Sequence, residues 1–219
     1  MNPNSNIFQS VYFRTTYPDQ EGLTETPLIA FTGRSNAGKS SLISALCNQK
    51  NLARAARTPG KTRNLNVFEG NLEGNPFYLC DLPGFGYANL PREERKRLGK
   101  IIEGFFLEAP GLTMTLILCD SARWPGEEEA AIEQILLNKG ARCQWVFTRW
   151  DRLNQKEKAK ARKRWKEMGI ASEAVAVSST KGTGLNELRK RIRRNVAGYY
   201  GLNEQSTETQ QDPDPETSG

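Results

Sequence analysis

Short apolar runs alternate along most of the chain with stretches in which apolar residues recur at helical spacing. The runs are almost uninterrupted, which is typical of strands that are buried on both faces of a parallel sheet. Buried strands are predicted at residues 28–32, 76–80, 113–119, 143–148 and 174–177, and an edge strand at residues 65–69. The alternation predicts an α/β fold with a mostly parallel six-stranded sheet, one antiparallel edge strand, and helices on both faces.

Three of the intervening stretches carry an apolar stripe along one helical face. Residues three or four positions apart share a face of a helix, so each stripe is expected to pack on the sheet rather than to form a binding surface. The stripes are Leu42, Ala45 and Leu46; Ile132, Ile135 and Leu136; and Leu185, Leu188, Ile192 and Val196.

The two ends of the chain differ from this body. Residues 1–26 mix a short apolar patch with turn-forming residues and predict an extension that packs loosely on the main domain, residues 27–202. Residues 203–219 contain too little apolar surface to offset the entropy of ordering, which predicts a disordered acidic tail. The tail has five acids and no base, so a net charge of +6 for the whole chain becomes +11 without it. A body this basic favours an anionic partner, and a polyanion is the first candidate.

Composition excludes several other classes of protein. The apolar runs fall short of the roughly 20 residues of a membrane span, and the start of the chain lacks a signal-peptide pattern. We therefore expect a cytoplasmic protein, and we separately predict that it is a monomer. The four cysteines are widely spaced and the chain has no histidine, which favours reduced core cysteines over a zinc site.

A phosphate-binding motif follows the first predicted strand. Residues 33–41 read GRSNAGKSS and match GxxxxGK[ST] where a strand leads into a helix. Such a loop turns its backbone N–H groups toward phosphates, while Lys39 would reach the β- and γ-phosphates and the Ser40 hydroxyl would ligate Mg²⁺. The predicted phosphate-binding residues are Gly33, Arg34, Ser35, Asn36, Ala37, Gly38, Lys39, Ser40 and Ser41.

Two further segments complete the predicted phosphate and magnesium site. The sequence Asp81-Leu82-Pro83-Gly84 ends a buried strand, where Asp81 would hold Mg²⁺ through water and the Gly84 N–H would meet the γ-phosphate. Between the two motifs, residues 57–63 form a basic turn in which Thr62 is the predicted second hydroxyl ligand of Mg²⁺, ordered when the γ-phosphate is present. This turn and the residue after it contribute Gly60, Lys61, Thr62, Arg63 and Asn64 to the predicted site. Lys39, Thr62 and Gly84 are the predicted catalytic residues.

Two later strand ends predict a guanine-binding pocket. They carry Thr148, Arg149, Trp150 and Asp151, and then Ser178, Ser179 and Thr180. An ionised Asp151 accepts hydrogen bonds from guanine N1–H and the 2-amino group, whereas adenine would leave that carboxylate unpaired. The pocket therefore predicts GTP and GDP as ligands, and an ATP-using enzyme becomes the weakest alternative.

Taken together over residues 28–185, these segments resemble the TRAFAC-class GTPases, which have a three-layer P-loop NTPase fold (Ras-like G domain). The sequence motifs GRSNAGKSSLI, TPGKTRN and DLPGFGYA are similar to those of the EngB ribosome-biogenesis GTPases, also called YihA or YsxC. The resemblance implies a role in assembly of the large ribosomal subunit and in growth and septation. One departure is Arg149, where the family's base motif usually has lysine.

The residue after Gly84 predicts slow hydrolysis. Many GTPases have glutamine there to orient the attacking water, but this chain has Phe85, whose ring cannot hydrogen-bond water. We expect intrinsic turnover on the order of 10⁻⁴ s⁻¹ or below. Activation by a partner is one possibility; another, which the resemblance suggests, is a K⁺ ion coordinated at Asn36.

Three basic clusters are candidate contacts for rRNA of the large ribosomal subunit or its precursor. They comprise residues 156–166, residues 189–194, and Arg92, Arg95, Lys96, Arg97 and Lys100. Each could instead be a solvated helix face, but three clusters on a body of +11 favour RNA phosphates. Two functions remain open at this point: a hydrolysing switch, or a nucleotide-gated RNA-binding module in which hydrolysis is incidental.

Overall fold

A computed structural model of the protein describes residues 8, 11–17, 26–49, 52, 65–86, 91–109 and 111–202. The predicted threonine loop at residues 57–64 and the predicted acidic tail at residues 203–219 lie outside these described residues, as do Tyr87 and Ala88.

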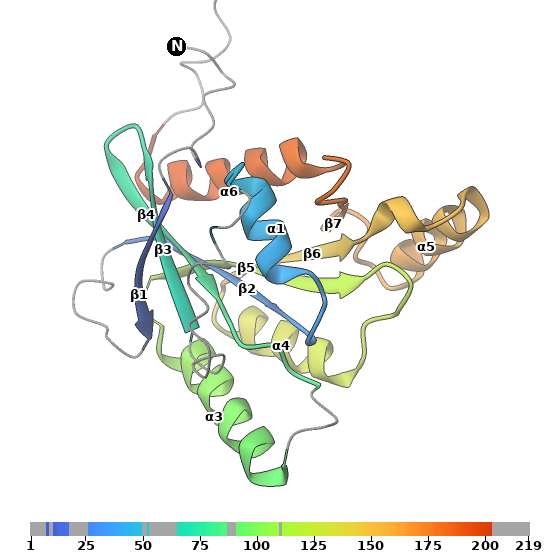
Figure 1. The fold of residues 1–219 in the computed structure, drawn as a ribbon, viewed down its shortest axis with the longest axis horizontal. Helices are drawn as coiled ribbons and strands as arrows, with labels where there is room; N and C mark the ends of the chain where they lie inside the picture. The colour runs from blue at the N-terminus through green and yellow to red at the C-terminus, as the bar shows by residue number, and fades with distance from the viewer. Residues whose placement is uncertain are drawn as a thin grey trace, which may run out of the picture.

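A single mostly parallel sheet forms the centre of the fold (Figure 1). Its strands lie in the order β1-β3-β4-β2-β5-β6-β7. Their bounds are β1 Tyr12–Tyr17, β2 Leu28–Gly33, β3 Leu65–Leu72, β4 Asn75–Asp81, β5 Leu112–Asp120, β6 Arg142–Thr148 and β7 Ala174–Ala176. The predicted fold class is confirmed, with seven strands in place of six.

The extra strand is β1, which pairs antiparallel with β3 at the edge of the sheet. The prediction of an edge strand at residues 65–69 is therefore wrong, because β3 lies between β1 and β4 and is antiparallel to both. Aromatic contacts fix this N-terminal region: the Phe13 ring lies 5.9 Å from that of Phe68, and Phe8 lies 6.0 Å from Phe77. Phe8 is fully buried, so residues near the start of the chain contribute to the core.

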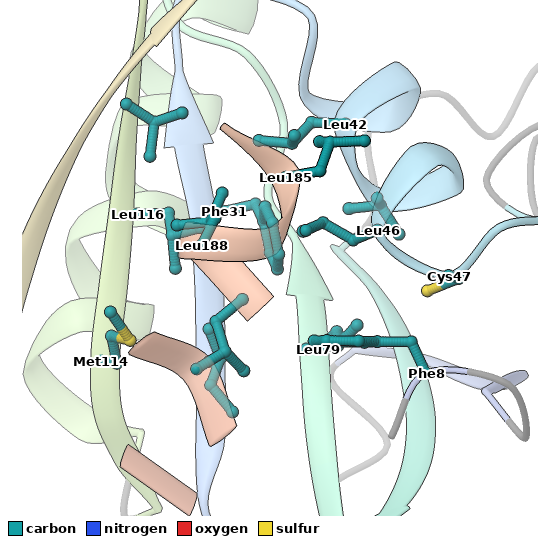
Figure 2. Packing of buried hydrophobic residues seen from close by; sticks show 14 of the residues in the cluster. Phe8, Phe31, Leu42, Leu46, Cys47, Leu79, Met114, Leu116, Leu185 and Leu188 are labelled. Carbon is teal, nitrogen blue, oxygen red and sulfur yellow. The ribbon is translucent and has the colours of Figure 1, made fainter. Parts of the chain in front are cut away.

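Helices cover both faces of the sheet, and alternation along the strands supplies each side with apolar residues. On one face, α1 (Lys39–Leu46) and α6 (Leu185–Tyr199) pack on residues such as Phe31, Leu79 and Leu116 (Figure 2). The other face is covered by α3 (Arg92–Glu108), α4 (Glu127–Asn138) and α5 (Gln155–Glu167). The three predicted apolar stripes lie on α1, α4 and α6, and all their residues except Ala45 and Ile135 are buried.

All four cysteines are free thiols, and three are buried. Burial raises the pKa of Cys47 and of Cys143 to about 12, so their reactive thiolate forms are scarce at neutral pH. Within the described residues, none of the helices has the length and apolar character needed to cross a bilayer.

The parallel strands bring their carboxyl ends to one edge of the sheet, where α/β folds bind ligands. There β2 leads into the glycine-rich loop, β4 ends at Asp81, β5 ends at Asp120, and β6 ends at Thr148. A 3₁₀ turn, η1 (Trp150–Arg152), follows β6 directly. The segments that the sequence singled out therefore converge although they are far apart along the chain.

Candidate nucleotide-binding site

The glycine-rich loop depends on backbone conformations that side chains oppose. Gly33 has φ +147°, and a Cβ there would lie 2.4 Å from the Leu118 carbonyl oxygen of β5. Gly38 has φ +93° immediately before α1 begins at Lys39. These glycines let the loop turn tightly around the N-terminus of α1, where N–H groups and the helix dipole favour a bound anion.

Lys39 is held inside the loop. Its side chain is buried, and its Nζ donates to the carbonyl oxygens of Gly33 at 2.8 Å and of Arg34 at 3.1 Å. An ammonium fixed in this position places its charge in the concavity of the loop. The arrangement suits the phosphate contact that the sequence predicted.

Ser40 and Asp81 meet at the ends of β4 and the glycine-rich loop. The Ser40 Oγ donates to the Asp81 Oδ2 at 3.0 Å, and the aspartate is buried. Within the described residues, no group of three or more histidine, cysteine or acidic side chains is arranged to hold a metal ion. One hydroxyl and one carboxylate are instead a donor set that fits Mg²⁺, which keeps several waters and takes further oxygens from substrate phosphates.

The segment after Asp81 lies directly against the glycine-rich loop. A Cβ on Gly84 would come within 2.8 Å of the Ser35 backbone and 3.0 Å of Lys39 Nζ. Next to it, the Ser35 N–H donates to the Phe85 carbonyl at 2.8 Å, and the Phe85 N–H donates to the Gly33 carbonyl at 3.4 Å. Arg34 and Phe85 thus form a parallel β-bridge beyond the ends of β2 and β4.

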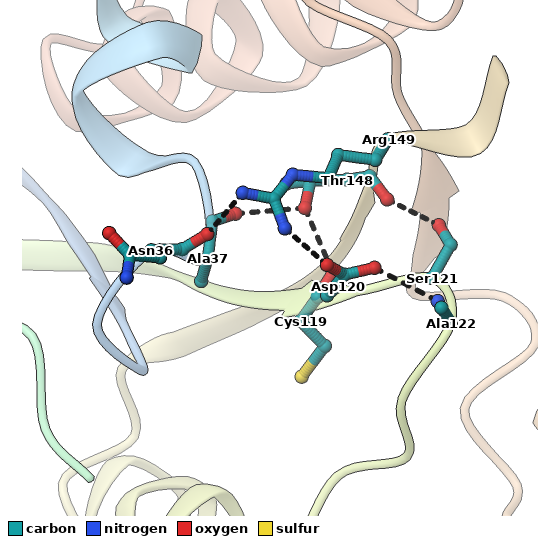
Figure 3. Close-up of polar contacts among 8 residues, drawn as sticks. All are labelled: Asn36, Ala37, Cys119, Asp120, Ser121, Ala122, Thr148 and Arg149. Atoms are coloured by element: carbon teal, nitrogen blue, oxygen red, sulfur yellow. Dashed lines mark hydrogen bonds and ion pairs between the residues drawn. The ribbon is translucent and has the colours of Figure 1, made fainter. Parts of the chain in front are cut away.

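At the other end of the site, side chains join three loops (Figure 3). The Thr148 hydroxyl donates to the Ala37 carbonyl at 2.8 Å. Arg149, in a left-handed conformation with φ 57°, donates to the Asn36 carbonyl at 2.7 Å and forms an ion pair with Asp120. Asp120 also accepts from the Ala122 N–H at 3.0 Å. The forked guanidinium of Arg149 therefore reaches two acceptors at once, on two different loops.

Asp151 is exposed beside the loop after β7. Hydrogen bonding from Ser178 holds the pKa of the Asp151 carboxyl below its ordinary value, so the group is ionised at neutral pH. The Ser178 hydroxyl in turn lies 3.1 Å from the Thr180 hydroxyl, and the Trp150 N–H donates to the Val177 carbonyl at 3.0 Å. The negative charge required for guanine recognition is therefore present.

Two acids that the sequence reasoning did not single out support the site. Asp120 orients Arg149, and its position at the end of a parallel strand, like that of Asp81, is the signal that could have identified it. Glu129 is buried and accepts from Arg34 Nε at 3.2 Å and from the Gly126 N–H at 2.9 Å. It lies within a run of three glutamates at the start of α4, which gave no reason to choose it.

The structure brings the described members of the predicted site to one edge of the sheet. These are residues 33–41, 81–84, 148–151 and 178–180, while residues 60–64 lie outside the described part of the chain. Three features are typical of a P-loop GTPase. They are a glycine-rich loop before α1, an aspartate at the end of β4, and a turn after β6 whose aspartate can recognise a nucleobase.

Comparison with known proteins specifies the family. Residues 28–149 match the family described as "50S ribosome-binding GTPase". The chain is 37% identical over 194 residues to a probable GTP-binding protein EngB of Leptospira biflexa, covering 87% of this chain and 88% of the relative. It is 35% identical to the EngB of Clostridioides difficile, covering 90% of this chain and 96% of that one. The chain belongs to the EngB family of GTP-binding proteins.

Solved structures agree on the fold. A probable GTP-binding protein EngB superposes with a TM-score of 0.61 at 21% identity, covering 78% of this chain and 99% of the other. A structure of Era in complex with MgGDPNP and a fragment of 16S ribosomal RNA gives a TM-score of 0.59 at 21% identity, covering 78% of this chain and 57% of Era.

Proposed function

We propose that this protein is a GTP-dependent switch that acts in the assembly of the large ribosomal subunit and is needed for normal growth and septation. It works in the cytoplasm as a monomer, and GTP orders the Thr62 and Gly84 segments so that the protein docks on a pre-ribosomal particle. Slow hydrolysis to GDP, stimulated by a partner, then releases it.

The position of Gly84 is the observation that carries this proposal. Its backbone lies against Ser35 and Lys39, where a single added carbon would not fit. We infer that a third phosphate bound at this place would displace the segment. A group that has to move when a third phosphate is present distinguishes GTP from GDP. The match to a family described as ribosome-binding supports the ribosomal partner.

The proposed chemistry is divided among several residues of the site. Ser40 and Asp81, together with Thr62, would hold Mg²⁺, which offsets charge on the phosphate oxygens when bound. Lys39 provides a fixed positive charge near the same oxygens, and the Gly84 N–H orients the γ-phosphate. Phe85 cannot orient water, which is why hydrolysis is slow without a partner.

Co-sedimentation with purified large ribosomal subunits tests the proposal. We expect a non-hydrolysable GTP analogue to retain more protein on the subunits than GDP does, and higher salt to release it. Equal retention with the two nucleotides would contradict the switch. The Asp81→Asn variant is the matched control, because it keeps the surface charges of the basic helices while altering the predicted magnesium ligand.

A second candidate is a nucleotide-gated RNA-binding module in which hydrolysis is incidental. Phe85 favours it, since the chain has no glutamine at that position. A variant unable to hydrolyse GTP separates the two: the switch predicts that it stays trapped on the particle, whereas the module predicts normal cycling.

K⁺ stimulation is a further part of the proposal. Asn36 is exposed in the glycine-rich loop, and its backbone is left-handed with φ 64°. Hydrolysis should then be faster in K⁺ buffer than in Na⁺ buffer of equal ionic strength, and equal rates would remove this part.

A further inference from the structure

The three basic clusters have different environments in the folded protein. On α6, Arg189 donates to the carbonyls of Ala45 and Leu46, which closes the C-terminus of α1. Arg191 bonds Glu187 and Gln144, and Arg193 bonds Glu73. Most of the positive charge on α6 therefore holds the fold together and is not available to a partner.

The bases of α5 are different. Helix α5 has seven bases and two acids, and both acids lie near its ends. Glu157 closes the capping box with Asn154, while Glu167 lies 3.9 Å from Lys163. Within the part of the chain that the structure describes, Lys156, Lys158, Lys160 and Lys166 make no ion pair. The helix thus presents positive charge that the protein does not neutralise.

Two arginines on α5 are held by tryptophan rings. Arg164 lies 4.1 Å from the centre of the Trp124 ring, and Arg162 lies 5.6 Å from that of Trp150. Stacking on an indole fixes the plane of a guanidinium and leaves its N–H groups at the edge, where they can bond phosphate oxygens. Trp124 is in the β5–α4 loop, next to the exposed Arg123, so this loop extends the charged area.

A row of lysines lies along the exposed face of α5. Lys156, Lys160 and Lys163 are exposed and lie on one face at helical spacing, opposite the buried Ala161 and Trp165. Because the apolar side of α5 is packed in the core, the helix has no free apolar face to insert into a lipid surface.

We propose that α5 with Arg123 and Trp124, here termed the α5 surface, binds the phosphate backbone of RNA. This inference rests on the proposed ribosomal function and assigns its RNA contact to one of the three clusters. Regularly spaced lysines and two ring-supported guanidiniums on a rigid helix suit a repeating polyanion. In Figure 1, α3 lies along the bottom of the molecule and α5 at its right edge, so the two clusters belong to separate surfaces.

The test is fluorescence anisotropy of a labelled hairpin RNA with the full chain in its GDP form, titrated at several KCl concentrations. One variant is Lys156→Gln with Lys160→Gln and Lys163→Gln. The matched variant removes the same charge from α3: Arg92→Gln, Lys96→Gln and Lys100→Gln, all exposed. Melting temperature and GDP affinity verify that both variants fold.

We expect the α5 variant to bind RNA at least 10-fold more weakly, with the slope of log Kd against log salt reduced by about 2 to 3 for three lost phosphate contacts. The α3 variant should lose less. Equal losses in the two variants, or no loss in the α5 variant, would overturn the proposal. Binding to vesicles containing phosphatidylserine but not to RNA would also overturn it.

Trp124→Leu gives a second measurement that net charge alone does not affect. It removes the ring under Arg164 and no charge, so RNA affinity should fall several-fold while the salt slope stays the same. Unchanged affinity would count against the ring-supported contact.

Failure of the α5 surface and failure of the proposed switch give different results. RNA binding through α5 without nucleotide-dependent retention on subunits contradicts the switch alone, whereas nucleotide-dependent retention of the α5 variant at wild-type strength contradicts the α5 surface alone.

Discussion

At the base end of the nucleotide site, side-chain hydrogen bonds and an ion pair join three loops, whereas at the phosphate end the segment after β4 meets the glycine-rich loop mainly through backbone groups. Thr148 and Arg149 reach the carbonyls of Ala37 and Asn36 at 2.8 and 2.7 Å. At the phosphate end, Gly84 and Phe85 lie against Ser35 with no side chain between them. The comparison suggests a base pocket that is fixed in advance and a phosphate pocket that can rearrange.

The largest effect is expected from Asp151→Asn at the fixed end. It removes the negative charge that is predicted to accept two hydrogen bonds from guanine, each worth about 1.5–3 kcal/mol, so GDP affinity should fall by about 10²- to 10⁴-fold. Equilibrium titration with a fluorescent GDP analogue measures this. Retention of wild-type affinity would show that Asp151 does not contact the base.

Ser40→Ala probes the phosphate end. It removes the hydroxyl that lies 3.0 Å from Asp81 Oδ2, and we expect the Mg²⁺-dependent part of GTP-analogue affinity to fall by more than about 10-fold. The same titration with EDTA is the internal control, because affinity without Mg²⁺ should be the same for both proteins. An equal loss with EDTA would point to damage to the loop instead.

Gly84→Ala tests how closely the phosphate-end loops approach. Its Cβ would lie 2.8 Å from the Ser35 backbone, so the free energy of unfolding should fall by about 1–3 kcal/mol. Gly99→Ala on α3 is the matched control: it has open space within 4 Å and should stabilise the helix by up to about 1 kcal/mol. Urea denaturation measures the free energy of unfolding of both variants and of the wild-type protein. If Gly84→Ala were as stable as the wild type, the segment around Gly84 would be able to move away from Ser35 at little cost.

A smaller effect is expected when the support of the base end is weakened. Asp120→Asn removes the charge that pairs with Arg149, and the pair is partly exposed, at 19% and 34%, so the cost in stability should be about 1 kcal/mol or less. A double-mutant cycle with Arg149→Gln isolates the coupling between the two residues. Strictly additive effects would mean that Asp120 does not orient Arg149.

The smallest effect concerns pH. The pKa of Asp151 is held below its ordinary value of 3.8 by Ser178, so the carboxylate stays charged above that value and loses its charge only as the pH falls through the lowered pKa. The contribution of Asp151 to guanine affinity should therefore be constant between pH 8 and pH 5. We expect the ratio of wild-type to Asp151→Asn affinity to be constant across that range; a steady decline would indicate a raised pKa.

The sequence was informative where local spacing determines position. The phosphate loop, Asp81 and the base-recognition segment each follow a predicted strand, and parallel strands place their carboxyl ends together. Contacts between distant segments were not encoded in this way. The pairing of β1 with β3 depends on Phe13 meeting Phe68, and the support of Arg34 by Glu129 depends on the approach of α4.

Charge patterns were the least specific signal. Residues 156–166 and 189–194 look alike in sequence, but Arg189, Arg191 and Arg193 are bound to the protein itself, whereas most of α5 is exposed. Only the fold determines which bases have an acid or a carbonyl nearby. For that reason the sequence could indicate a polyanion as partner but not where it binds.

The β-bridge between Arg34 and Phe85 has a consequence for the balance between the two nucleotides. Opening it breaks two backbone hydrogen bonds, each with a net worth of about 0.5–1.5 kcal/mol, so the opened form would have a population of roughly 1–15%. A ligand that requires the opened form binds more weakly by that fraction. The protein would therefore rest with the bridge closed, and its response to GTP would depend on how far a partner shifts this population.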